Sequence, residues 1–152
     1  MYLEIYFHLH LFSVVVRPND LYFVGLNTLK IKLIDFGSGA FIENRAYTEY
    51  QGTRFYSPPE WINYCVYSPE GLTVWSLGIL LYVILCGDIP FYTEKEIKRG
   101  NIKWLPQQKL SQGAKSLIKA YLIVDPSKRI SLGELANSPW LSGTDFIVNN
   151  TS

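Results

Sequence analysis

Asp35 and Gly37, in the tripeptide Asp35-Phe36-Gly37, are the residues of this chain whose types and spacing are best suited to chemistry. A carboxylate is an oxygen ligand of the kind that hard divalent cations prefer. A glycine two residues later lets the backbone turn beside a bound ion. Taken alone, such a tripeptide is more often an ordinary turn, so its meaning depends on the segments around it.

Length and composition narrow the class of protein. The chain has 152 residues, enough for one domain, and 48% of them are hydrophobic, with 11 Tyr and 4 Trp, which favours an aromatic-rich core. The 14 Lys and Arg residues are nearly balanced by 13 Asp and Glu residues. The chain therefore lacks the excess of positive charge that nucleic-acid binding requires. Two cysteines, Cys65 and Cys86, make no disulfide framework in a chain of this length. A reducing compartment is therefore expected, namely the cytoplasm, with the nucleus as an additional location.

The run from Val74 to Cys86 is apolar and uncharged, and Gly87 and Pro90 follow it. It is shorter than the roughly 18 residues that a membrane helix needs. An apolar run of this length without charge on any face is typical of a central helix buried on all sides. We therefore expect a buried core helix here and no membrane partner.

Capping signals predict three further helices. Thr93 precedes a short polar helix, Ser111 precedes a longer one, and Ser131 with Glu134 forms a capping box at the start of a helix that reaches Asn137. The second of these has an apolar stripe at spacings of three and four, which we expect to face the core. The stripe comprises Ala114, Leu117, Ile118, Tyr121 and Leu122.

Two features precede Asp35. Leu21–Val24 and Ile31–Ile34 are short β-rich runs around a turn, which predicts a hairpin. Residues 1–16 are apolar, but Glu4 lies inside them and a basic residue follows them, which argues against a secretory signal. A strand or helix packed on the domain, or a stretch without a defined place in the fold, are the two remaining interpretations.

The order of the motifs resembles the C-terminal lobe of eukaryotic protein kinases, and in particular the Pim family of serine/threonine kinases. The resemblance covers roughly Asn19 to Leu141. Val74 supports the Pim assignment, because most kinases have an aspartate there and Pim-type sequences have an apolar residue. The matching motifs are Asp35-Phe36-Gly37-Ser38-Gly39-Ala40, Gly52-Thr53-Arg54, Tyr56-Ser57-Pro58-Pro59-Glu60-Trp61, Val74–Tyr82, Cys86–Phe91 and Pro126–Arg129.

The resemblance implies roles for individual residues. Asp35 would hold Mg²⁺ on the phosphates of ATP. Thr53 would line the floor where the substrate hydroxyl enters, or alternatively its hydroxyl bonds to the backbone. Asp88 stands where Pim-type kinases have an acidic residue that selects basic substrates, but Val83 replaces the acidic residue one turn earlier. A solvated loop carboxylate is therefore the other interpretation of Asp88.

Glu60 and Arg129 have a structural role in the family. The pair forms a buried bridge between the end of the activation segment and the last helices, a task for which two-pronged arginine–carboxylate geometry is well suited. The resemblance therefore implies a buried ion pair between Glu60 and Arg129 that does not depend on nucleotide.

The catalytic loop departs from the family pattern. Counted back from Asp35, the His-Arg-Asp triplet falls on three valines, so Val16 occupies the position of the catalytic aspartate. The loop lysine and the metal-binding asparagine fall on Pro18 and Leu21, or on Arg17 and Asp20 after a shift of one residue. Nothing upstream resembles an ATP-binding lobe. No catalytic residue is therefore expected to be intact, and binding of ATP and Mg²⁺ by this chain is in doubt.

Two functional classes follow from these observations. In the first, the chain belongs to an ATP-dependent, Pim-like serine/threonine kinase and is inactive as written. In the second, it is a non-catalytic kinase lobe or pseudokinase that acts through protein–protein interaction. The expected fold class is mainly α, a kinase-like C-lobe with a short hairpin before Asp35 and without the β-rich N-terminal lobe. The expected divisions are a leader (1–18), a partial kinase domain (19–141) and a polar tail (142–152), in a monomer whose partners are protein substrates or full-length kinases.

Overall fold

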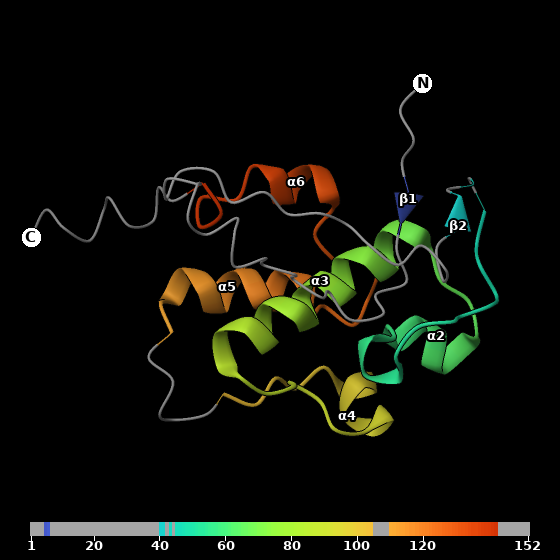
Figure 1. Ribbon diagram of the computed structural model, residues 1–152, viewed down its shortest axis with the longest axis horizontal. Helices are drawn as coiled ribbons and strands as arrows, with labels where there is room; N and C mark the ends of the chain where they lie inside the picture. Colours follow the sequence, from blue (N-terminus) through green and yellow to red (C-terminus); the bar gives the residue numbers. More distant parts are fainter. Residues whose placement is uncertain (1–4, 7–39, 42, 44, 105–109, 143–152) are drawn as a thin grey trace, which may run out of the picture.

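The computed structural model describes residues 5–6, 40–41, 43, 45–104 and 110–142, and this part of the chain is mainly helical (Figure 1). The predicted mainly α fold class is thereby confirmed. The helices pack around α3, which runs through the middle of the molecule. In chain order the elements are β1 (Ile5–Tyr6), β2 (Ala40–Phe41), the 3₁₀-helix η2 (Arg54–Tyr56), α2 (Pro59–Tyr64), α3 (Pro69–Cys86), α4 (Glu94–Arg99), α5 (Gln112–Tyr121) and α6 (Leu132–Ala136).

Helix α3 begins at Pro69, earlier than the predicted Val74. Ser68 caps it, because the Ser68 hydroxyl accepts a hydrogen bond from the backbone N–H of Gly71 at 3.1 Å. Proline suits the first helical position, where its missing N–H would have no partner inside the helix. The helix ends at Gly87, whose φ of 72° is in the left-handed region that glycine adopts without strain.

One side of α3 is buried as predicted and another is not. Trp75 and Ile79 are both 0% exposed, which confirms that the helix lies in the core. Val83 is half-buried, and Ile84 is 67% exposed. The expectation that every face of this helix is covered is therefore wrong for the described part of the chain.

The length of α3 also corrects a sequence-based argument. With 18 residues and a mean hydropathy of 1.6, it is long and apolar enough to cross a membrane by these two measures. The same measures are met by core helices of globular domains. Because Trp75 and Ile79 are fully enclosed among residues of other elements, the packing of α3 is that of a core helix.

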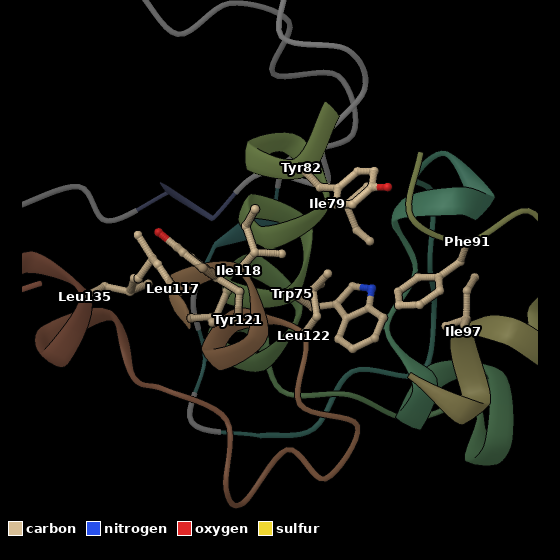
Figure 2. Packing of buried hydrophobic residues seen from close by; sticks show 11 residues of the cluster. Trp75, Ile79, Tyr82, Phe91, Ile97, Leu117, Ile118, Tyr121, Leu122 and Leu135 are labelled. Atoms are coloured by element: carbon tan, nitrogen blue, oxygen red, sulfur yellow. The ribbon is translucent and has the colours of Figure 1, made fainter. Parts of the chain in front are cut away.

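The core lies between α3 and its neighbours (Figure 2). Helix α5 packs directly on α3, and its predicted apolar stripe is buried. The two helices come close at Gly78, where an added Cβ would lie 2.4 Å from the Cβ of Tyr121. On the other side of α3, the ring of Phe91 stacks on Trp75 with centroids 5.8 Å apart. These contacts fix α3 relative to the segments on either side of it.

The three helices predicted from capping signals are present. Thr93 caps α4 and Ser131 caps α6, each in a capping box with the glutamate three residues on, and the Ser111 hydroxyl accepts a bond from Ala114 at the start of α5. Helix α6 ends at Ala136, one residue short of the expectation. Each capping bond joins residues that are close in sequence, which explains why these helix starts could be predicted.

Other elements were not predicted or cannot be compared. The sequence analysis did not anticipate α2, nor the antiparallel pairing of β1 with β2, in which Ile5 faces Phe41 and Tyr6 faces Ala40. The predicted hairpin of Leu21–Val24 and Ile31–Ile34 lies outside the described residues.

Candidate functional site

Two residues of the predicted site lie outside the described part of the chain. These are Asp35, the predicted metal ligand, and Val16, at the predicted position of the catalytic aspartate. Among the residues that the structure describes, no group of three His, Cys, Asp or Glu side chains could hold a metal ion. The candidate site is therefore built from the segment between residues 45 and 60 and the elements that support it.

Thr53 lies directly before η2, and it is half-buried. Its carbonyl accepts hydrogen bonds from the Tyr56 backbone N–H at 2.9 Å and from the Tyr50 hydroxyl at 2.8 Å. Its side chain makes no capping bond to η2. The backbone of Thr53 is thus held from two sides.

An aromatic cluster of Tyr47, Tyr50, Trp61 and Tyr67 holds the segment before Thr53. Tyr47 and Tyr67 exchange backbone hydrogen bonds of 2.9 and 3.1 Å, and their rings stack at 5.8 Å. The Tyr50 ring contacts Trp61 and meets the Tyr67 ring edge-on. The Tyr67 hydroxyl donates to the carbonyl of Glu49 at 2.6 Å. The sequence analysis noted the abundance of tyrosine but did not identify this cluster.

The aromatic cluster should make stability depend on pH in the alkaline range. Burial, with the nearby Tyr47 and Glu49, raises the pKa of Tyr67 from 10.0 to about 12. In the unfolded chain Tyr67 ionises near pH 10, so the stabilisation is present below that pH and is lost as the pH rises from 10 towards 12. We expect the urea midpoint to fall between pH 9 and pH 11, and to fall less in Tyr67→Phe.

The matched control for this measurement is Tyr64→Phe, at a tyrosine of α2 that is 75% exposed. An equal alkaline loss in the parent chain and in Tyr67→Phe would show that Tyr67 does not contribute.

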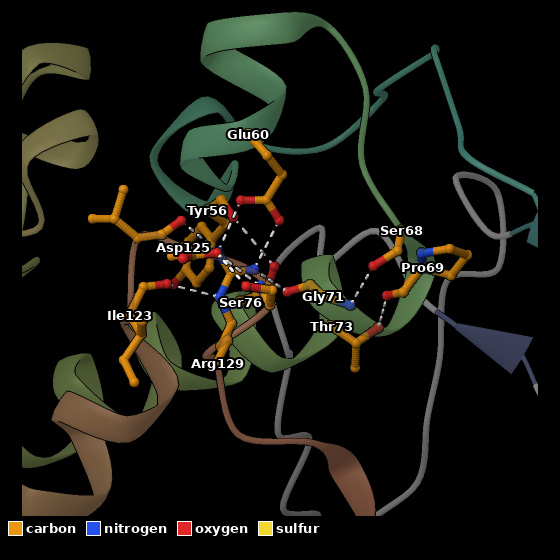
Figure 3. A network of polar contacts seen from close by, with 12 residues as sticks. Tyr56, Glu60, Ser68, Pro69, Gly71, Thr73, Ser76, Ile123, Asp125 and Arg129 are labelled. Atoms are coloured by element: carbon orange, nitrogen blue, oxygen red, sulfur yellow. Dashed lines mark hydrogen bonds and ion pairs between the residues drawn. The ribbon is translucent and has the colours of Figure 1, made fainter.

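Glu60 and Arg129 are brought together by the fold (Figure 3). Nη1 and Nη2 of Arg129 each donate to one carboxylate oxygen of Glu60, both at 2.8 Å. The two side chains are only 1% and 8% exposed, in that order. The pair has the two-pronged geometry in which arginine binds carboxylate most strongly.

Arg129 also satisfies its remaining donors. Nε donates to the carbonyl of Ile123 at 3.0 Å, Nη1 to that of Gly71 at 2.7 Å and Nη2 to that of Val124 at 3.4 Å. All five N–H groups of the guanidinium thus have acceptors. The guanidinium carbon lies 5.1 Å from the centre of the Trp75 ring. One side chain therefore joins the start of α2, the start of α3 and the loop after α5.

Two further contacts fix η2. The Ser76 hydroxyl of α3 donates to the carbonyl of Tyr56 at 3.2 Å, and the Ser57 hydroxyl donates to that of Arg54 at 2.6 Å. On the surface, the Arg54 guanidinium pairs with Glu94 of α4. The backbone of η2 is thus anchored, and its side chains Arg54 and Phe55 are exposed.

Asp88 lies in the loop between α3 and α4 and is partly exposed. Its carboxylate accepts hydrogen bonds from the Tyr92 hydroxyl and from the Ile89 backbone N–H. These bonds lower the pKa of Asp88, the one from Tyr92 most. Both carboxylate oxygens thus have partners on the loop, and Val83, at the position of the second acidic residue, carries no charge.

The described residues thus provide a rigid support for the segment from Tyr47 to Glu60. Inside, the aromatic cluster and the Arg129 ion pair hold it, and outside it displays Arg54 and Phe55. This arrangement holds the segment in one conformation.

Comparison with known proteins agrees with this architecture. Residues 16–141 match the protein kinase domain family. Over 118 residues the chain is 45% identical to the zebrafish (Danio rerio) serine/threonine-protein kinase pim-2, which covers 78% of this chain and 37% of that protein. It is 39% identical over 123 residues to the serine/threonine-protein kinase prk-2 of Caenorhabditis elegans, covering 78% of this chain and 27% of that protein.

A more distant relative widens the comparison. Calcium-dependent protein kinase 24 of Arabidopsis thaliana is 36% identical over 140 residues, covering 86% of this chain and 24% of that protein. The chain therefore spans well under half the length of these relatives. Because the family match extends over most of its residues, the chain belongs to the protein kinase family, and its sequence is of the Pim-like serine/threonine type.

Proposed function

We propose that this chain forms the substrate-facing helical part of a serine/threonine protein kinase, and that its 152 residues alone transfer no phosphoryl group. The observation that carries the first half is the buried ion pair of Glu60 with Arg129, which anchors the end of the segment that would receive a protein substrate. The expected lack of phosphoryl transfer rests on Val16, which occupies the position of the catalytic aspartate. Loss of a general base alone costs about 10²–10⁴ in rate.

Protein kinases use ATP and Mg²⁺, so the fit of the residues to these ligands bears on the proposal. Among the described residues, no three His, Cys, Asp or Glu side chains lie together in a group that could hold a metal ion. Asp35, the predicted ligand, lies outside them. No step through the nucleotide is therefore assigned to this chain.

A kinase assay tests the proposal. The purified chain is incubated with magnesium-ATP and a basic serine peptide, beside an Asp35→Ala variant that reveals contaminating kinases. We expect no phosphate transfer above the level of that variant, because a base at the hydroxyl and a clamp on the phosphates are both required. Turnover in the parent chain that disappears in Asp35→Ala would overturn the proposal.

Protein binding without catalysis is the second candidate function. The fixed η2, with Phe55 43% exposed beside the exposed Arg54, favours it. Fluorescence anisotropy without nucleotide measures whether the chain binds the same basic serine peptide. Binding would distinguish a protein-binding lobe from a chain that neither binds the peptide nor phosphorylates it. A cytoplasmic location and a monomeric state belong to the same proposal, and Cys65 and Cys86, which are not joined in a disulfide, are in keeping with a reducing compartment.

A further inference from the structure

Positive charge is concentrated in one stretch of a chain that is nearly neutral as a whole. All 13 Asp and Glu lie outside residues 97–124, which reach from the end of α4 to the loop after α5. A charge asymmetry of this kind bears on association with a charged partner rather than on the fold. The basic residues of the stretch are Lys98, Arg99, Lys103, Lys109, Lys115 and Lys119.

The fold brings the two ends of this stretch side by side. The backbone after α4 runs along α5, because an added Cβ on Gly100 would collide with the Val124 side chain and the Trp104 ring lies beside Lys115. Trp104 packs in turn on Tyr82 of α3, with ring centroids 5.8 Å apart. Helix α5 and the segment after α4 therefore form one continuous part of the surface.

Two lysines of α5 keep their charge without a carboxylate partner in the described part of the chain. The Lys103 ammonium pairs with Glu96, but no ion pair among the described residues involves Lys115 or Lys119. The Lys115 ammonium lies 5.9 Å from the centre of the Trp104 ring, a contact that holds it in place without neutralising it. Lys119 is exposed. We call Lys115 and Lys119 the lysine pair.

The lysine pair is unfavourable for α5 itself. Residues four positions apart are neighbours on the surface of a helix, and like charges at this spacing destabilise it. The helix dipole favours Lys119, which lies in the last turn, but this effect does not extend to Lys115. A carboxylate bound between the two ammonium groups would remove their repulsion. The lysine pair is therefore explained better by an anionic partner than by the stability of the helix.

Spacing and surroundings favour an acidic protein segment as that partner. The lysine pair is separated by about 6 Å along the helix axis, close to the distance of about 6.6 Å between alternate side chains of an extended chain. Among the described residues, the exposed large hydrophobic side chains all lie outside residues 97–124, so a membrane would meet no apolar anchor there. Lys115 lies over the Trp104 ring, where a nucleic-acid base would otherwise stack.

We propose that α5 is a docking surface for an extended acidic segment of a partner protein, with carboxylates at alternate positions on Lys115 and Lys119. Fluorescence anisotropy of a labelled octapeptide of alternating Glu and Ser tests this with the full chain. The parent should bind the peptide at low ionic strength and release it as salt is added. Lys115→Gln/Lys119→Gln should bind at least about five-fold more weakly, because two exposed ion pairs are lost.

Two further variants separate the lysine pair from charge in general. Lys115→Arg/Lys119→Arg keeps both charges and should bind within about two-fold of the parent. Arg45→Gln/Lys128→Gln removes two exposed charges elsewhere and should also bind like the parent. Equal binding by the parent and Lys115→Gln/Lys119→Gln, or an equal loss in Arg45→Gln/Lys128→Gln, would overturn the proposal.

The same titration distinguishes other anionic partners. Oligothymidylate and phosphatidylserine vesicles replace the acidic peptide, and tighter binding of either one would overturn the choice of a protein segment. Neither ATP nor the basic serine peptide is present, so the result does not depend on whether the chain belongs to an active kinase.

Discussion

Replacing Arg129 with alanine is expected to lower the free energy of unfolding by about 3–5 kcal/mol, because it leaves the carboxylate of Glu60 buried without its partner. Glu60 is only 7% exposed in the intact fold, so water cannot replace the two lost hydrogen bonds. The carbonyls of Gly71 and Ile123 lose a donor at the same time. Urea denaturation followed by circular dichroism measures the loss.

The chain offers a matched control for this prediction in Arg54→Ala. Arg54 also pairs with a glutamate, but its side chain is 77% exposed and that of Glu94 is 40% exposed. Exposed pairs contribute at most about 1 kcal/mol, so this change should be small. If Arg129→Ala does not fold, Arg129→Lys can be measured instead. Lysine keeps the positive charge but lacks the planar guanidinium group, so this variant should unfold at a lower urea concentration than the parent. Equal losses from Arg54→Ala and Arg129→Ala would contradict the prediction.

The second large effect is expected at Gly78, where α3 and α5 come closest. An alanine Cβ at this position would lie 2.4 Å from the Cβ of Tyr121 and 2.9 Å from a methyl carbon of Leu122. Since both contacts are below the separation that carbon atoms tolerate, the helices must move apart. Overpacking of this kind costs about 1–3 kcal/mol or more, which exceeds the gain of about 1 kcal/mol that alanine brings over glycine inside a helix.

Gly133→Ala is the control for Gly78→Ala. Gly133 lies in α6, and a Cβ there would meet nothing within 4 Å. The same substitution should be neutral or stabilising by up to about 1 kcal/mol at this position. Thermal unfolding of the two variants beside the parent measures the difference. A Gly78→Ala chain as stable as the parent would show that the α3–α5 contact is looser than the structure indicates.

The sequence by itself was sufficient for the features that depend on neighbours in the chain. Thr93, Ser111 and Ser131 begin the helices that they were predicted to begin, because a cap is a bond between residues three positions apart. The order of motifs was sufficient for the family, since residues 16–141 match the protein kinase domain. The roles of Val16 and Asp35 stay predictions, because both residues lie outside the described part of the chain.

Only the tertiary structure decided the features that depend on residues far apart in the sequence. The aromatic cluster joins Tyr47 to Tyr67, and the surface pair joins Arg54 to Glu94. The resemblance implied that Glu60 and Arg129 pair, but the backbone acceptors of Arg129 and its place over Trp75 follow from the packing of α3. The exposure of Ile84 on α3 is the clearest case. An isoleucine such as Ile84 can be buried or exposed, so its residue type alone does not predict its exposure. Its exposure depends on which segments pack against that side of the helix.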